Sequence, residues 1–180
     1  MFKKTKLSPS DLSAVAISEG PGSYTGLRIG VSAAKGICFP LNIPLIALDT
    51  MHILARKIEC SEGYIVPAID ARRDEIYFAM FQSTNCKIPE LKVKTDTMIL
   101  SSDSFSNYYE TSTVNFVGDC NKKIMQYLNH ENIFFSDYIL PSANEMGILS
   151  HSKYVKEQFV NVAEFQPKYL KDFGAKKINN

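Results

Sequence analysis

The stretch from Glu19 to Gly36 constrains the fold more than any other part of the chain, because three structural signals follow one another in it. The apolar run at residues 12–17 has the length of a buried strand. Residues 20–22, Gly-Pro-Gly, predict a tight turn, since glycine tolerates positive φ and proline presets φ. Ser23 or Thr25 is then suited to cap a helix. Strand, glycine turn and helix in this order are typical of α/β proteins that handle phosphate.

The predicted helix, residues 24–38, contains two glycines, and each interior glycine costs about 1 kcal/mol relative to alanine. One face carries small residues and one isoleucine: Gly26, Gly30, Ala33 and Ile37. The adjoining stripe is apolar: Leu27, Val31, Ala34 and Cys38. The opposite side is polar: Arg28, Ser32 and Lys35. We therefore expect another backbone to approach the small-residue face closely, from this chain or from another protein.

Composition narrows the class of protein. The chain has 180 residues, of which 45% are hydrophobic and 22% charged, as in ordinary globular proteins. A net charge of +1 gives no support for strong electrostatic capture of nucleic acid, and no apolar run is long enough to span a membrane. The cysteines are widely spaced and lack a C-x-x-C pair: Cys38, Cys60, Cys86 and Cys120. We expect reduced thiols in a cytoplasmic protein, with no metal site.

The middle of the chain predicts a boundary and a hairpin. Residues 45–48 predict a second strand, followed by a helix that Thr50 is suited to cap and that runs to about Cys60. A change in composition there places a domain boundary between residues 61 and 62, which gives units 1–61 and 62–180. Residues 64–69 and 75–81 flank a short polar turn and predict a β-hairpin. The second of these strands is apolar on both faces, as expected of a central strand.

The remainder completes a mixed α/β pattern. Residues 83–94 predict a loop with an edge strand near Leu91. Further strands are expected at residues 114–117 and 133–135, and helices at residues 102–109, 121–128 and 142–155. In the last helix Ser142 and Glu145 form a predicted capping box, with Met146, Leu149 and Tyr154 towards the core. Residues 165–171 predict an ordered apolar tether before a basic tail.

Two groups of residues suggest chemistry. Gly20-x-Gly22-x-x-x-Gly26 matches neither the dinucleotide fingerprint nor the P-loop, so a tight turn competes with a phosphate site. Asp70 ends a predicted strand, where a carboxylate could hold Mg²⁺ through water, although a solvated hairpin turn is the alternative. The arginines beside it, Arg72 and Arg73, could bind a phosphate or the carboxylates of a partner.

Other chemistry has less support. The histidines His52, His130 and His151 have no spacing that places two on one helix face, so no metal site is expected. Ser23 lacks the G-x-S-x-G context and nameable partners, which argues against a serine hydrolase. The lysines near the C-terminus could touch RNA or could simply be solvated. The residues by themselves identify no catalytic set.

Three motifs resemble one known family. Residues 20–36 together with Asn42-Ile-Pro-Leu45 look like the signature of the TsaB (YeaZ) family. Residues 69–77, Ile-Asp-Ala-Arg-Arg-Asp-Glu-Ile-Tyr, fit its second hallmark, and Pro167-Lys-Tyr-Leu170 resembles its usual ending. The resemblance implies an actin-like ATPase (ASKHA, ribonuclease H-like) fold with two related lobes. It also implies a non-catalytic scaffold in the synthesis of threonylcarbamoyladenosine next to the anticodon of tRNA.

The same resemblance implies which proteins the chain binds and which of its residues contact TsaD. The expected partner is TsaD, which transfers the threonylcarbamoyl group, with TsaE recruited by the pair and tRNA contacted indirectly. Carried over by motif, the contact with TsaD falls on the helix already described, at Tyr24, Gly26, Leu27, Gly30, Val31, Ala33, Ala34 and Cys38. On this basis Gly30→Leu is expected to abolish TsaD binding and to leave the fold largely intact. The candidate nucleotide contacts are Gly22, Ser23, Asp70 and Arg72, for at most weak ATP or ADP with Mg²⁺.

The chain also departs from the pattern of the family, whose members begin with a strand, a hairpin and a helix ahead of residue 12. We therefore expect an incomplete N-terminal lobe with an exposed sheet edge and a tendency to self-associate. Two other classes of function remain open. One is a small ASKHA-type nucleotide enzyme that uses Asp70. The other is a structural homodimer in which the helix pairs with its own copy.

Overall fold

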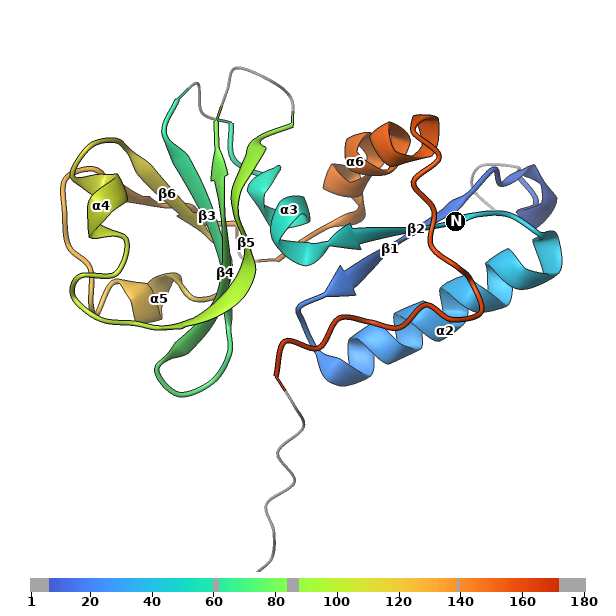
Figure 1. Cartoon of the computed structure of the whole chain (residues 1–180), viewed down its shortest axis with the longest axis horizontal. Coiled ribbons are helices and arrows are strands. Elements are labelled where there is room, and N and C mark those ends of the chain that lie inside the picture. Colours follow the sequence, from blue (N-terminus) through green and yellow to red (C-terminus); the bar gives the residue numbers. More distant parts are fainter. Residues whose placement is uncertain (1–6, 60–61, 84–87, 139, 172–180) are drawn as a thin grey trace, which may run out of the picture.

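The computed structural model describes residues 7–59, 62–83, 88–138 and 140–171, and within them two β-sheets lie side by side (Figure 1). The first part of the chain forms η1 (Pro9–Asp11), β1 (Val15–Gly20), α2 (Tyr24–Leu41), β2 (Leu45–Asp49) and α3 (Thr50–Ala55). The second forms β3 (Tyr64–Asp70), β4 (Glu75–Gln82), β5 (Glu90–Ile99), α4 (Ser106–Tyr109), β6 (Val114–Val117), α5 (Asn121–Ile124) and β7 (Ile133–Phe135). The last element is α6 (Ala143–Val155).

The first sheet pairs β1 and β2 in parallel and is covered on both faces. On one face, Ala34 and Cys38 of α2 pack against Leu45 of β2. On the other face, Leu149 of α6 packs against Ile46 of β2. Among the described residues no strand pairs with the outer edge of β1, so this edge is open, as the sequence predicts.

The second sheet has the strand order β5-β4-β3-β6-β7, with β3 at its centre. The hairpin β3–β4 is antiparallel, whereas β6 and β7 continue the sheet in parallel. Both faces of β4 are buried: Ile76 and Met80 face α4 and α5, and Ala79 and Phe81 face α3. The prediction that this strand is covered on both faces is therefore confirmed; β4 is an interior strand of the sheet, next to the central β3.

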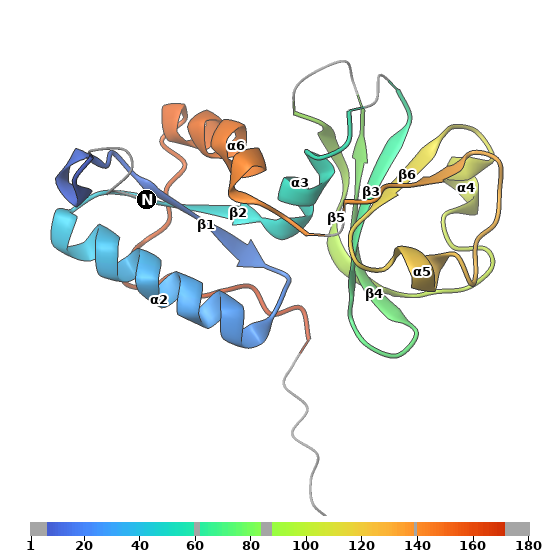
Figure 2. The same cartoon turned by 180° about the vertical axis from the view of Figure 1, so that it is seen from behind.

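Helix α3 lies between the two sheets and is buried in both directions (Figure 2). Its residues Met51 and Leu54 pack on the second sheet, while Ile53 packs on the first. Asp49 is the N-cap, with its carboxylate accepting from the Met51 amide at 2.7 Å, so the assignment of Thr50 as cap is wrong by one residue. The helix ends at Ala55, well before the predicted end near Cys60, which lies outside the described residues.

The C-terminal part of the chain returns to the first sheet. Helix α6 packs on β2, and Val160 forms an antiparallel bridge to Leu45. Residues 161–171 then run along α2 towards its N-terminus, as both views show. Residues 143–171, which the sequence groups with the second unit, thus lie on the first, and the boundary at residue 61 falls on residues that are not described.

Other elements differ from expectation at their ends. Strand β5 is ten residues long, although only a short edge strand near Leu91 was predicted. The helices predicted at residues 102–109 and 121–128 are the four-residue α4 and α5. Tyr154 is 40% exposed, so the prediction that it faces the core is wrong. In the described parts of the chain no helix has both the length and the apolar character needed to cross a bilayer.

Candidate functional site

The glycine loop ends in the predicted helix cap. The Ser23 hydroxyl accepts a hydrogen bond from the Gly26 amide at 3.3 Å, so Ser23, not Thr25, caps α2. Gly20 has a φ of 110°, and a Cβ there would stand 2.9 Å from the carbonyl oxygen of Lys168. The glycine is therefore needed both for its φ and for the approach of the C-terminal segment.

A cavity of about 640 Å³ lies between the two sheets, beside this loop. Its walls come from the start of α2, the ends of β3 and β6, and residues 168–171. The four residues predicted to contact a nucleotide all line it: Gly22, Ser23, Asp70 and Arg72. The fold thus brings together residues that are far apart in sequence, while their binding of a nucleotide stays a prediction.

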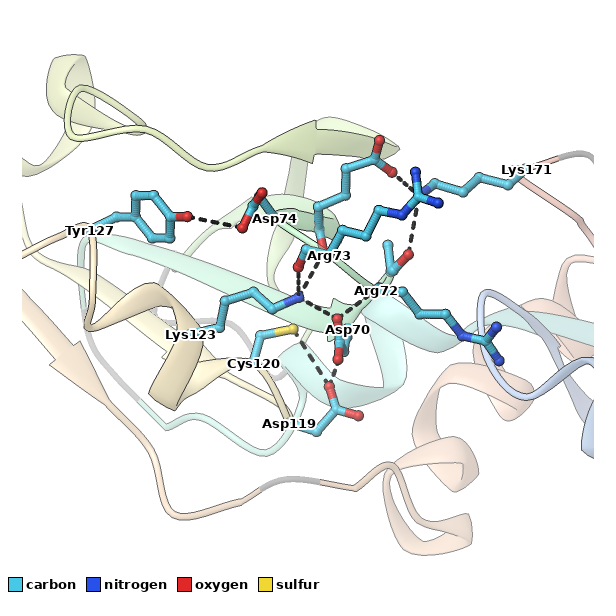
Figure 3. Close-up of polar contacts among 11 residues, drawn as sticks. Asp70, Arg72, Arg73, Asp74, Asp119, Cys120, Lys123, Tyr127 and Lys171 are labelled. Carbon is cyan, nitrogen blue, oxygen red and sulfur yellow. Dashed lines mark hydrogen bonds and ion pairs between the residues drawn. The ribbon is translucent and has the colours of Figure 1, made fainter. Parts of the chain in front are cut away.

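Asp70 lies at the centre of a polar network at the end of β3 (Figure 3). Its carboxylate forms an ion pair with Lys123 of α5 and accepts from the Arg72 amide at 2.8 Å. The hydrogen bond from the Lys123 ammonium therefore lowers the pKa of Asp70, although partial burial acts against this. Lys123 also donates to the carbonyls of Arg73, at 2.6 Å, and Glu75, at 3.2 Å, and thereby fixes the β3–β4 turn.

Sequence reasoning missed the members of this network that follow β6. The Asp119 carboxylate accepts from the Asp70 amide at 2.9 Å and contacts the buried Cys120 thiol. Burial and the neighbouring carboxylates raise the pKa of Cys120, which keeps this thiol protonated. These residues meet Asp70 only because β3 and β6 pair in parallel, and no local motif marks them.

The Asp70 carboxylate is engaged through one oxygen. The Lys123 ammonium and the Arg72 amide both contact its Oδ1 atom, while the side chain remains 49% exposed. In the part of the chain that the structure describes, no group of three or more His, Cys, Asp or Glu side chains could hold a metal ion. Binding of Mg²⁺ through water at Asp70 therefore stays a prediction.

The C-terminal segment 165–171, which we call the strap, connects the two units. Lys168 pairs with Glu19 beside the glycine loop at 2.5 Å, and Phe165 is packed beneath α2. Lys171 reaches the β3–β4 turn, where its ammonium pairs with Glu75 and donates to the Ala71 carbonyl at 3.1 Å. The predicted ordered tether is thus confirmed up to residue 171.

A second cavity, of about 370 Å³, lies on the other side of the strap. Apolar side chains such as Phe81 and Leu170 line it, together with His52 of α3. The His52 ring lies 4.8 Å from the Phe81 ring, and its buried Nε2 atom has no hydrogen-bond partner among the described residues. Burial, with Lys153 and Arg56 nearby, lowers the pKa of His52 to about 4, so the imidazole is neutral at pH 7.

The residues predicted to contact TsaD do not share one surface. Val31, Ala34 and Cys38 are buried against the chain's own first sheet, which excludes them from a surface contact in this conformation. Tyr24, Leu27 and Gly30 are partly buried, and a Cβ on Gly30 would stand 3.2 Å from Ile17 of β1. A leucine at residue 30 would require the end of the Ile17 side chain to move, so the expectation that Gly30→Leu spares the fold stays a prediction.

The outward face of α2 is a different set of residues, only two of which were predicted: Gly26, Ile29, Ala33, Gly36 and Phe39. Ile29 is 66% exposed and Phe39 is 75% exposed, while a Cβ on Gly36 would meet nothing within 4 Å. The outward face shares Gly26 and Ala33 with the small-residue face described from the sequence, and the site of TsaD contact stays a prediction.

Two α/β units with a cavity between them, each built on a sheet with helices on both faces, define a two-lobed protein of the actin-like (ASKHA) class. Residues 1–178 match the sequence model of the family described as tRNA N6-adenosine threonylcarbamoyltransferase (TsaD). The chain belongs to this family. Its relatives include curated proteins named TsaB, solved structures named YeaZ, and curated proteins named tRNA N6-adenosine threonylcarbamoyltransferase.

Three relatives illustrate the match. The tRNA threonylcarbamoyladenosine biosynthesis protein TsaB of Haemophilus influenzae is 26% identical over 178 residues, which are 91% of this chain and 72% of the relative. TsaB of Bacillus subtilis is 37% identical over 93 residues, covering 52% of this chain and 41% of the relative. YeaZ from Pseudomonas aeruginosa superposes with a TM-score of 0.76 at 22% identity, covering 94% of this chain and 80% of that one. The chain thus aligns with less than half of the Bacillus relative.

Proposed function

We propose that the chain is a non-catalytic subunit in the threonylcarbamoylation of adenosine in tRNA, and that it binds TsaD through the outward face of α2. The observation that carries this proposal is the exposure of that face. Two large apolar side chains, Ile29 and Phe39, flank small residues on a well-formed helix. TsaE would join through the pair of subunits.

The chemistry of the outward face suits a helix of another protein. Burial of an isoleucine or phenylalanine side chain contributes about 1.5–3 kcal/mol each, and Gly26, Ala33 and Gly36 between them allow two helices to approach closely. The opposite face of α2 is already occupied by the first sheet, through Val31, Ala34 and Cys38. Helix α2 would thus pack against the first sheet with one face and against TsaD with the other.

Gly36→Leu tests the contact without disturbing the fold. The new side chain points into open space, and leucine favours a helix over glycine by up to about 1 kcal/mol. In the interface it would overpack a close helix contact, so we expect TsaD binding to weaken at least about 10–100-fold. The measurement is light scattering on a sizing column with TsaD from the same source.

Gly147→Leu is the matched control, because Gly147 also lies in a helix, α6, with nothing within 4 Å of its Cβ position. The wild-type chain and this control should form a one-to-one heterodimer with TsaD. A Gly36→Leu chain that binds as well as wild type would place the interface elsewhere. A wild-type homodimer that TsaD does not dissociate would support the self-pairing alternative instead.

We further propose that the chain does not hydrolyse ATP, although Gly22, Ser23, Asp70 and Arg72 share a cavity. The Asp70 carboxylate, which an ASKHA-type enzyme would use for Mg²⁺, forms an ion pair with Lys123, so a Mg²⁺ ion would have to share it with this ammonium. Purified chain, alone and with TsaD, should therefore show the same phosphate release as its Asp70→Ala variant. An ATPase activity of the chain that disappears in Asp70→Ala would establish the enzyme alternative.

A further inference from the structure

The β3–β4 turn carries two adjacent arginines, Arg72 and Arg73, which we call the arginine tip. The acidic groups around it are already engaged by other side chains. Asp70 pairs with Lys123, and Glu75 pairs with Lys171. Asp74 accepts from the Tyr127 hydroxyl at 3.2 Å. The carboxylates of the turn thus hold the turn in place, and none of them forms an ion pair with Arg72 or Arg73, although Asp70 attracts Arg72 at longer range.

Both guanidinium groups of the arginine tip are exposed, and neither has a hydrogen bond or ion pair with any described residue. A guanidinium presents a planar fork of donors that suits carboxylate or phosphate oxygens. The two side chains point in different directions (Figure 3), and neither guanidinium has a hydrogen-bond acceptor among the described residues, so each is available for an external anion.

The backbone conformation of the turn does not favour arginine, which indicates that the two arginines serve another purpose than forming the turn. Arg72 and Arg73 have φ values of 71° and 55°, a region that glycine and asparagine occupy more easily than arginine. Strain of this kind persists where the surrounding structure enforces it, and it is common at functional positions. The Lys123 and Lys171 contacts to the turn supply that enforcement here.

The surroundings add an aromatic surface. Arg72 lines the 640 Å³ cavity, and so do Tyr24 and Tyr169 from the opposite wall. The Arg28 guanidinium stacks 4.1 Å from the Tyr24 ring centre and donates to the Tyr169 hydroxyl at 3.1 Å. Tyr169 remains 42% exposed. Cations and an exposed aromatic ring therefore border the same cavity.

We propose that the arginine tip binds the phosphate backbone of RNA, with the tRNA substrate as its source; this rests on the proposed function. Arginine forks neutralise phosphates, and exposed aromatic rings stack on unpaired bases. Arg72 on one wall of the cavity and Tyr24 and Tyr169 on the other therefore match the phosphate and the base of a single-stranded nucleotide. Arg73 lies outside the cavity lining and would contact a neighbouring phosphate. An acidic protein segment would use the arginines but not the aromatic wall. The net charge of +1 confines the contact to this patch and to a few phosphates.

The test uses the full chain in complex with TsaD and an unmodified tRNA transcript, with affinity measured over a range of salt concentrations. Arg72→Asn/Arg73→Gly should weaken binding about tenfold or more at low salt, and the slope of log K against log salt should become shallower by about 1–2. The matched control is Lys92→Gln/Lys156→Gln, which removes two exposed positive charges, on β5 and after α6, that do not line the cavity. The control should retain the wild-type slope.

A loss of tRNA binding in this variant is not expected to come from unfolding. Asparagine and glycine adopt positive φ more easily than arginine, so the substitutions relieve backbone strain in the turn. The melting temperature of Arg72→Asn/Arg73→Gly should stay at the wild-type value or rise by a few degrees. A wild-type slope in this variant, or an equal change in the control, would overturn the proposal. Loss of the TsaD complex in the variant with tRNA binding unchanged would also overturn it, in favour of a protein partner. Absence of a wild-type complex with TsaD would instead refute the proposed function.

Discussion

Gly118→Ala should lower the free energy of unfolding by about 4 kcal/mol or more, the largest loss that we expect from a single methyl group in this chain. Gly118 directly follows β6 and has a φ of 131°. A Cβ on it would stand 2.0 Å from the carbonyl oxygen of Ala68 in β3. The methyl group can be accommodated only if β6 and β3 move apart, and both strands are fully buried around Ala68 and Val117.

The measurement is the urea or thermal unfolding midpoint of the variant. Gly36→Ala is the control, since it adds the same methyl group to a helix position with open space and should raise stability by up to about 1 kcal/mol. A wild-type midpoint for Gly118→Ala would contradict the geometry described for the end of β6.

The second large effect is a loss of stability in mild acid, caused by His52. Its pKa is lowered from 6.5 to about 4 by burial first and then by Lys153 and Arg56. Above pH 6.5 the imidazole is neutral in the folded and the unfolded chain and contributes no pH dependence. As the pH falls from 6.5 to 4, the unfolded chain binds a proton that the folded chain does not. The free energy of unfolding should therefore decrease by about 3 kcal/mol over this window.

His52→Phe separates this effect from the titration of the carboxylates. Phenylalanine keeps a ring beside Phe81 and removes both the ionisable group and the buried Nε2 atom that lacks a partner. The difference in free energy of unfolding between wild type and variant should thus change by about 3 kcal/mol between pH 7 and pH 4. Parallel pH profiles for the two proteins would show that His52 does not titrate in this way.

Local sequence patterns predicted a large part of the fold, because turns, helix caps and hairpins are determined by residues that are close together in the sequence. The glycine turn, the Ser23 cap and the β3–β4 hairpin each depend on neighbouring residues, and each lies where the sequence indicates. Strand β5 was underestimated although its inward positions, Val93, Thr95 and Thr97, alternate with exposed ones. Strand β5 lies at the edge of the sheet and is polar on its exposed face, which makes the alternation of buried and exposed positions hard to detect in the sequence.

The candidate site was less predictable, because tertiary pairing creates it. Lys123 and Asp119 meet Asp70 through the parallel pairing of β3 with β6, which no local motif specifies. Which small residues of α2 face outward depends on which side of the helix the first sheet covers. Gly30 lies against Ile17, whereas Gly36 faces open space, and periodicity alone treats them alike.

The return of α6 and the strap to the first sheet has a consequence for the order of synthesis. The second sheet, from Tyr64 to Phe135, is enclosed between two segments of the chain that together make the first lobe. On the ribosome, residues 64–135 are therefore complete before β2 can receive α6 or pair with Val160. Until then the apolar face of the β1–β2 sheet that α6 covers in the folded protein remains exposed. The lobe whose synthesis begins first is therefore the last to be completed.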